Sequence, residues 1–233
     1  MRIGSISENH NIEKRIAVTP EIIKKYTSLG FEVCLSENYG SHLGIKDELY
    51  KDFGAKIVKD DTEILNSSDI IVQLGILPDD KISKIRENQT LIGILNPYDN
   101  KDKLENLVKK KINLFSLELL PRITRAQSMD ILSSQANLAG YKAVIDSFAI
   151  FKKAIPMMMT AAGTIPASKV LVVGAGVAGL QAIATAKRMG AIVFATDVRL
   201  ASKEQVESLG GKFLVVEGAE NLETEGGYAK EAG

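Results

Sequence analysis

The sequence predicts an α/β protein with two domains, each built on a parallel β-sheet covered by helices. The chain has 233 residues, 45% of them hydrophobic and 25% charged, which is ordinary for a globular protein of two domains. Short aliphatic strands alternate with amphipathic helices over roughly the first 120 residues, a pattern typical of parallel sheets. A glycine-rich turn joins a strand to a helix near residue 174. This turn marks the start of a second sheet.

The first domain is expected to span residues 1–133. Its helices and strands follow from runs of aliphatic residues with helical or alternating spacing. No glycine-rich turn follows any of these strands, so we expect no phosphate-binding loop in this domain. The predicted strands are 2–6, 32–35, 56–58, 70–74, 90–95 and 112–115, and the predicted helices are 20–29, 46–53 and 101–109.

A polar, irregular segment at 121–130 leads into a long helical stretch that is expected to link the domains as residues 134–152. The second domain should then occupy residues 153–233. Its predicted strands are 169–173, 192–195 and 212–216, and its predicted helices are 178–189 and 202–209. A complete doubly wound domain has two βαβαβ halves. We therefore expect a Rossmann-like domain of which only the first half is present.

The turn contains Gly174, Ala175, Gly176, Val177, Ala178 and Gly179. In this GxGxxG pattern the first glycine allows a sharp reversal, the second leaves room for a pyrophosphate, and the third lets the helix pack on the strand. The following helix directs its N-terminal N–H groups at the phosphates. These six residues are candidate dinucleotide-binding residues, although a purely structural glycine turn has the same pattern.

The second strand of this domain ends just before Asp197, Val198 and Arg199, which are further candidates for cofactor binding. An acid about twenty residues beyond the glycines accepts hydrogen bonds from the adenosine ribose. Its charge repels a 2′-phosphate, which favours NAD over NADP. Arg199 could pair with such a phosphate, but we expect it to lie along the adenine or in solvent.

Composition excludes several other classes of function. The 29 basic and 29 acidic residues cancel, so no general field attracts nucleic acid. The single cysteine, Cys34, lies in an apolar run and is expected to be a buried, inert thiol, as in a reducing cytoplasm. We expect no metal site, no signal peptide and no transmembrane segment.

The motifs resemble a known family over essentially the whole chain. The blocks RITRAQSMD, from Arg122 to Asp130, and GVAGLQAIATAKRMGA, from Gly176 to Ala191, are similar to the NAD(H)-binding domain of the α subunit of proton-translocating nicotinamide nucleotide transhydrogenase. The resemblance implies hydride transfer between NAD(H) on this domain and NADP(H) on a partner subunit, coupled to proton movement through a membrane partner. It also implies a homodimer at the cytoplasmic face of the inner membrane.

The same resemblance implies roles for single residues. Arg122, Gln127 and Asp130 would form the catalytic, nicotinamide end of the site, together with Ser133 as a cofactor-binding residue. The segment at 226–233 resembles a mobile loop that closes over nucleotide, and it contributes Tyr228. Because the chain ends inside this loop, we expect a truncated or split subunit. A non-catalytic remnant that binds nucleotide poorly is an alternative.

Alanine dehydrogenase is the nearest competing family and shares the two-domain plan. Its chemistry needs a proton-transfer histidine and a substrate-binding lysine. This sequence has Asn96 where the histidine is expected and no lysine at residues 71–74, while His10 and His42 lie elsewhere in polar turns. Hydride transfer between two nicotinamides needs no protein acid or base. The sequence therefore favours transhydrogenase, with an alanine dehydrogenase-like oxidoreductase as an alternative.

Overall fold

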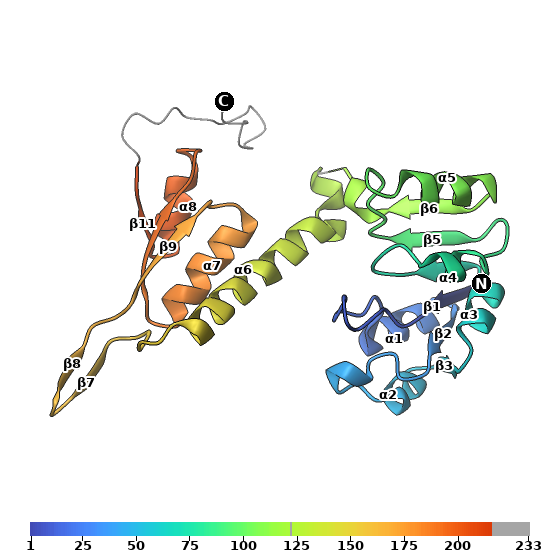
Figure 1. The fold of residues 1–233 in the computed structure, drawn as a ribbon, viewed down its shortest axis with the longest axis horizontal. Helices are drawn as coiled ribbons and strands as arrows, with labels where there is room; N and C mark the ends of the chain where they lie inside the picture. The colour runs from blue at the N-terminus through green and yellow to red at the C-terminus, as the bar shows by residue number, and fades with distance from the viewer. Residues whose placement is uncertain (122, 216–233) are drawn as a thin grey trace. The chain divides into compact units, whose positions relative to one another are not determined.

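The computed structural model describes residues 1–121 and 123–215, and the chain divides into two compact units, Met1–Asp130 and Ile131–Gly233 (Figure 1). Each unit contains a parallel β-sheet with helices, which confirms the predicted fold class. The helix predicted to link the domains is α6 (Ile131–Ile150), and it belongs to the second unit. Arg122 and Tyr228 lie outside the described residues.

The first unit holds a six-stranded sheet in the order β3-β2-β1-β4-β5-β6, with every neighbouring pair parallel. Six strands appear where the sequence predicts them, but the short helices α3 and α4 were not predicted. The elements are β1 (Arg2–Ser5), α1 (Pro20–Ser28), β2 (Glu32–Ser36), η1 (Ser41–Leu43), α2 (Asp47–Asp52), β3 (Ala55–Val58), α3 (Asp61–Ser67), β4 (Ile70–Val72), α4 (Asp79–Ile82), β5 (Thr90–Gly93), α5 (Lys101–Lys109), β6 (Asn113–Ser116), η2 (Leu117–Leu119) and η3 (Thr124–Met129).

Alternating side chains of the strands build one core on each face of this sheet. Val33 and Leu35 of β2 pack with helices α1 and α2, whereas Cys34 between them packs with α3, α4 and α5. This follows from the two-residue period of a strand. Cys34 is buried as predicted, and burial raises the pKa of its thiol. The fully buried Tyr39 and Tyr50 meet edge to face in the first of these cores.

The second unit holds a three-stranded parallel sheet in the order β11-β10-β9. Its core lies between this sheet and the helices α6 and α7, which run side by side (Figure 1). Val170 and Val172 of β9 face that core, whereas Leu171 and Val173 are 59% and 78% exposed. The elements are β9 (Lys169–Val173), α7 (Val177–Arg188), β10 (Ile192–Thr196), α8 (Ser202–Ser208) and β11 (Lys212–Phe213).

A small antiparallel hairpin precedes β9 and was not predicted. It is formed by β7 (Met158–Thr160) and β8 (Gly163–Ile165). Every residue of both strands is exposed, including Met158, Met159 and Ile165. A two-stranded hairpin without a packed face is marginally stable in water by itself.

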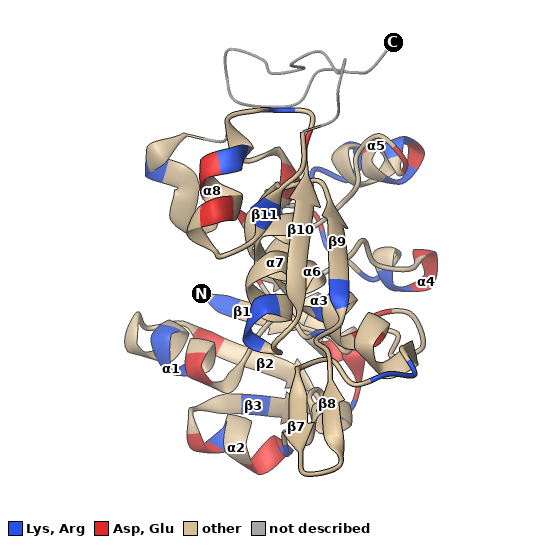
Figure 2. Cartoon of the chain, turned by 90° about the vertical axis from the view of Figure 1, so that its left-hand side faces the viewer, with Lys and Arg blue, Asp and Glu red and all other residues tan. Residues whose placement is uncertain are grey.

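Charges of both signs are distributed over the helices, while β9 and β10 are almost free of charge (Figure 2). Helix α8, for example, carries both lysine and glutamate. None of the helices in the described part of the chain is both long enough and apolar enough to span a bilayer.

Candidate dinucleotide-binding site

The turn between β9 and α7 has the geometry that its glycines predict. Gly174 has a φ of +93°, a conformation that favours glycine, and its N–H donates to the carbonyl of Thr196 at 2.8 Å. A Cβ on Gly179 would stand 1.8 Å from the carbonyl oxygen of Gly174. Two of the three glycines are therefore required by the fold itself.

Gly176 differs from the other two glycines. It is the N-cap of α7 in ordinary extended backbone, and no atom lies within 4 Å of the place where a Cβ would stand. The first N–H groups of a helix have no partner inside the helix. The turn therefore leaves open space beside uncompensated donors at the positive end of a 12-residue helix. This arrangement fits the pyrophosphate of a dinucleotide.

Helix α7 is held in place by close packing on α6. A Cβ on Gly140 of α6 would stand 2.0 Å from the carbonyl oxygen of Ala178, so the two helices touch backbone to backbone. The amide of Asn137 also donates to Gln181 Oε1 at 3.2 Å. Helix α6 therefore fixes the start of α7, where the turn ends.

Asp197 follows β10 and reaches back to the glycine turn. Its Oδ2 accepts the N–H of Ala175 at 2.6 Å, and its side chain is only 6% exposed. The hydrogen bonds from Arg199 and from Ala175, opposed by desolvation, lower the pKa of Asp197 to about 2. The carboxylate is therefore ionised at neutral pH and anchored to the turn.

The predicted position of Arg199 is wrong. Its guanidinium lies neither in solvent nor free to cover an adenine, because Nε donates to Asp197 Oδ1 at 2.8 Å and Nη2 donates to Oδ2 at 3.0 Å. Its backbone N–H also donates to Oδ1 at 2.8 Å. Spacing in the sequence does not reveal this, because a two-residue separation is compatible with many arginine rotamers. Val198, between the two, is 45% exposed.

The residues predicted for the nicotinamide end fall in two places. Gln127 lies within the 3-10 helix η3 of the first unit, and its carbonyl accepts the N–H of Asp130 at 3.2 Å. Ser133 lies in the first turn of α6, in the second unit, which also contains the glycine turn and Asp197. The structure thus gathers the turn, Asp197 and Arg199 into one site, and pairs Gln127 with Asp130 in another segment.

A second hollow lies wholly within the first unit. A cavity of about 550 Å³ opens where β1, β4 and β5 end, and β1 and β4 lie next to each other there although β2 and β3 separate them in the sequence. Parallel sheets commonly bind ligands at such a point. Sequence reasoning missed this cavity because strand order cannot be read from the spacing of strands.

The cavity brings together the positions at which the competing chemistry was sought. Asn96, Gln73 and Leu74 all line it. Burial raises the pKa of Glu8, which accepts the N–H of Leu74 at 2.8 Å, whereas the hydrogen bond from Arg15 lowers the pKa of Glu13 to about 2. Among the described residues, no histidine lines the cavity.

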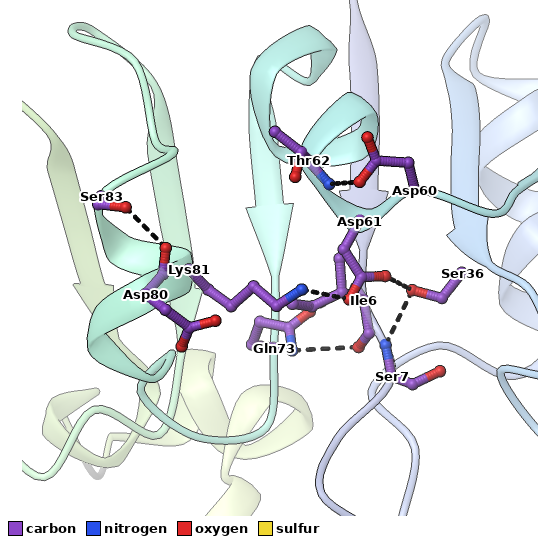
Figure 3. A network of polar contacts seen from close by, with 10 residues as sticks. All are labelled: Ile6, Ser7, Ser36, Asp60, Asp61, Thr62, Gln73, Asp80, Lys81 and Ser83. Atoms are coloured by element: carbon purple, nitrogen blue, oxygen red, sulfur yellow. Dashed lines mark hydrogen bonds and ion pairs between the residues drawn. The ribbon is translucent and has the colours of Figure 1, made fainter.

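The cavity also contains lysines, but they are held by acids. Lys81 donates to Asp61 Oδ2 at 2.7 Å, and Ser36 donates to Oδ1 of the same carboxylate at 2.6 Å (Figure 3). The N–H of Ser7 completes the chain by donating to Ser36 at 3.1 Å. Lys103 lies 3.0 Å from Asp79. These contacts tie the carboxyl ends of β1 and β2 to α3 and α4.

The two histidines form a pair that the sequence did not indicate. The rings of His10 and His42 stack with centroids 3.7 Å apart, and His42 Nε2 contacts the carbonyl of Lys14 at 2.8 Å. Within residues 1–121 and 123–215 there is no group of three or more histidine, cysteine or acidic side chains that could hold a metal ion.

The fold and the site define an α/β protein of the Rossmann-like nucleotide-binding class. Two family models match the chain, namely the alanine dehydrogenase/PNT N-terminal domain over residues 4–139 and the C-terminal domain over residues 143–230. The chain therefore belongs to the alanine dehydrogenase/PNT family. The family resemblance drawn from the sequence is confirmed.

Several known proteins are similar to this chain. An NAD(P) transhydrogenase alpha subunit protein of Rhodospirillum rubrum is 50% identical over 240 residues, covering 100% of this chain and 62% of that protein. A crystal structure of transhydrogenase from Sinorhizobium meliloti matches with a TM-score of 0.88 and 47% identity, over 92% of this chain and 64% of that one. An L-alanine dehydrogenase structure at 21% identity, with a TM-score of 0.80, shares the fold over 93% of this chain and 61% of its own. The chain thus spans less than two thirds of the length of these relatives.

Proposed function

We propose that this chain is the NAD(H)-binding component of a nicotinamide nucleotide transhydrogenase, an enzyme that transfers hydride between NAD(H) and NADP(H). The observation that carries the proposal is the open space at Gly176 beside the N-terminus of α7, with the ionised Asp197 anchored to the same turn. The relative from Rhodospirillum rubrum that is 50% identical supports the choice of reaction.

The work of the protein in this reaction is binding and orientation. Bound NAD(H) supplies the hydride donor or acceptor carbon, so no protein group has to move a proton. The turn from Gly174 to Gly179 would hold the pyrophosphate, and Asp197 would accept hydrogen bonds from the adenosine ribose. Its negative charge disfavours a 2′-phosphate, which supports NAD(H) here and NADP(H) on a partner subunit.

We assign the nicotinamide end to Arg122, Gln127, Asp130 and Ser133, and a closing loop to the segment around Tyr228. The support for this assignment is the RITRAQSMD block and its similarity to the transhydrogenase family. The hydrogen bond from Asp130 to Gln127 holds these two residues in one compact turn. Orientation of the ring and exclusion of water are the contributions that such residues make to hydride transfer.

The partners we propose are an NADP(H)-binding subunit and a membrane subunit that couples transfer to proton translocation, with this chain at the cytoplasmic face of the inner membrane. We also propose a homodimer. The hairpin β7–β8 supports it, because exposed Met158, Met159 and Ile165 on a two-stranded sheet form an apolar surface that a second copy could cover.

An alanine dehydrogenase-like reaction is the alternative within the same family, and the remaining alternative is a remnant without catalysis. The cavity of the first unit argues against alanine oxidation, because Asn96 and Leu74 stand where a proton-transfer histidine and a lysine would be needed. Lys81, which also lines the cavity, is bound to Asp61.

Mixing the chain with an NADP(H)-binding transhydrogenase subunit tests the proposal. Hydride transfer is followed with NADH deuterated at the transferred position, together with the oxidised NADP acceptor. We expect deuterium in the NADPH product, and no transfer when alanine or pyruvate replaces the second nucleotide. Activity on alanine would show that the alternative holds, and NADH binding without transfer would show a non-catalytic remnant.

A further inference from the structure

The carboxylate of Asp197 already has a full set of hydrogen-bond donors. Oδ2 accepts from the backbone N–H of Ala175 at 2.6 Å and from Arg199 Nη2 at 3.0 Å. Oδ1 accepts from the backbone N–H of Arg199 at 2.8 Å and from its Nε at 2.8 Å. An ionised carboxylate offers about four lone-pair positions. All of them are used.

The four donors differ in how easily they can leave. The N–H groups of Ala175 and Arg199 belong to the backbone of the turn and of the segment after β10, so they stay when a ligand arrives. The guanidinium of Arg199 is on a flexible side chain that is 19% exposed, and it supplies the other two donors as a planar fork. A ribose with free 2′ and 3′ hydroxyls also offers two adjacent donors. It therefore needs the same two positions on the carboxylate.

We propose that the Arg199 side chain occupies the ribose-recognition positions of Asp197 and must leave them when a nucleotide binds, so that Arg199 weakens affinity and reduces discrimination of the ribose 2′-hydroxyl. This inference rests on the proposed function, since it concerns how the NAD(H) site takes its ligand. Arg199 acts through Asp197 and is a positioning residue.

The proposal has a sign opposite to that of an ordinary contact. If Arg199 contacted the nucleotide, its removal would weaken binding. If it competes with the ribose, its removal leaves Asp197 held by the two backbone N–H groups with two acceptor positions open. A ribose hydroxyl then gains a hydrogen bond to a charged group without displacing another. The gain is larger for a ligand with a 2′-hydroxyl than for one without it.

The experiment compares Arg199→Lys and Arg199→Gln with the unmodified chain. Lysine keeps the positive charge, which matters for anionic phosphates, but it lacks the fork that fills both oxygens of Asp197. Glutamine removes the charge as well. Lys203→Gln is the matched control, because it removes a cation from the neighbouring helix α8, where Lys203 lies 4.0 Å from Glu207. Circular dichroism confirms that each variant is folded.

Binding is measured with NADH by its fluorescence, and with AMP and 2′-deoxy-AMP by competition against NADH. For Arg199→Lys we expect NADH to bind about threefold to tenfold more tightly, since a partly exposed ion pair no longer opposes it. The ratio of affinities for AMP over 2′-deoxy-AMP should rise by a similar factor. Lys203→Gln should change neither quantity.

Weaker or unchanged NADH binding in Arg199→Lys, or an unchanged ratio between the two adenylates, would overturn the role of Arg199 while leaving the proposed function standing. Absence of saturable NADH binding in the unmodified chain and in all variants would instead contradict the proposed function. Binding that appears only in the Arg199 variants would support the competition directly.

Discussion

Substitution of Gly176 and of Gly179 by alanine should separate nucleotide binding from folding. Gly176→Ala places a Cβ where no atom lies within 4 Å, and its backbone angles suit alanine. We therefore expect the free energy of unfolding to change by less than about 1 kcal/mol. The new methyl group would occupy the space proposed for the pyrophosphate. Loss of one backbone hydrogen bond to a charged group corresponds to about tenfold to hundredfold weaker NADH binding.

Gly179→Ala behaves in the opposite way because its Cβ would stand 1.8 Å from the carbonyl oxygen of Gly174, and backbone cannot move aside as a flexible side chain can. Overpacking costs about 1–3 kcal/mol, and alanine returns up to about 1 kcal/mol of helix propensity, so we expect a net loss of ~2 kcal/mol of unfolding free energy.

Urea unfolding followed by far-UV circular dichroism measures the stability of both glycine variants, and NADH fluorescence measures binding without interference, since the chain has no tryptophan. The reasoning predicts that Gly176→Ala is stable and binds poorly, whereas Gly179→Ala is destabilised. A Gly176→Ala chain that binds NADH as well as the unmodified chain would refute the role given to this open space.

Three further predictions concern charge, pH and packing. Asp197→Asn should weaken NADH but not NADPH binding, and should lower the unfolding free energy by ~2 kcal/mol at neutral pH, because the pKa of Asp197 is lowered from 3.8 to about 2. That stabilisation is present above pH 3.8 and is lost as the pH falls towards 2, so urea unfolding of the two chains should converge in acid; equal losses for both cofactors would show that Asp197 only holds the turn. Burial, together with His42 and Lys14, lowers the pKa of His10 from 6.5, so stability should fall as the pH drops below that value, and His10→Gln should reduce this dependence in thermal unfolding between pH 5 and 8; an unchanged pH profile would contradict it. Gly140→Ala should lower the melting temperature, since its Cβ would stand 2.0 Å from the carbonyl oxygen of Ala178, and an unchanged melting temperature would mean that α6 and α7 can separate without loss.

The strands of both sheets were predictable because each is a short aliphatic run bounded by a helix or a turn. Residues 169–173 were predicted as a strand and form β9, and the helix predicted from residue 178 begins one residue earlier, at Val177. The glycine turn was predictable because its spacing reflects backbone requirements, such as the positive φ of Gly174. These are local properties of the chain.

The features that the sequence did not reveal depend on contacts between distant residues or on the choice of rotamer. The cavity of the first unit exists because β1 lies beside β4, a matter of strand order. The stacking of His10 on His42 joins a loop to η1, and the pairing of Arg199 with Asp197 depends on a side-chain conformation. The hairpin β7–β8 was missed because its exposed methionines do not alternate with polar residues.

The structure of the chain with bound NADH would test the central claim most directly. The account predicts pyrophosphate oxygens beside Gly176 at the N-terminus of α7, and adenosine ribose hydroxyls on the carboxylate of Asp197. NADH bound in the cavity between β1 and β4, or bound without contact to the turn from Gly174 to Gly179, would contradict it.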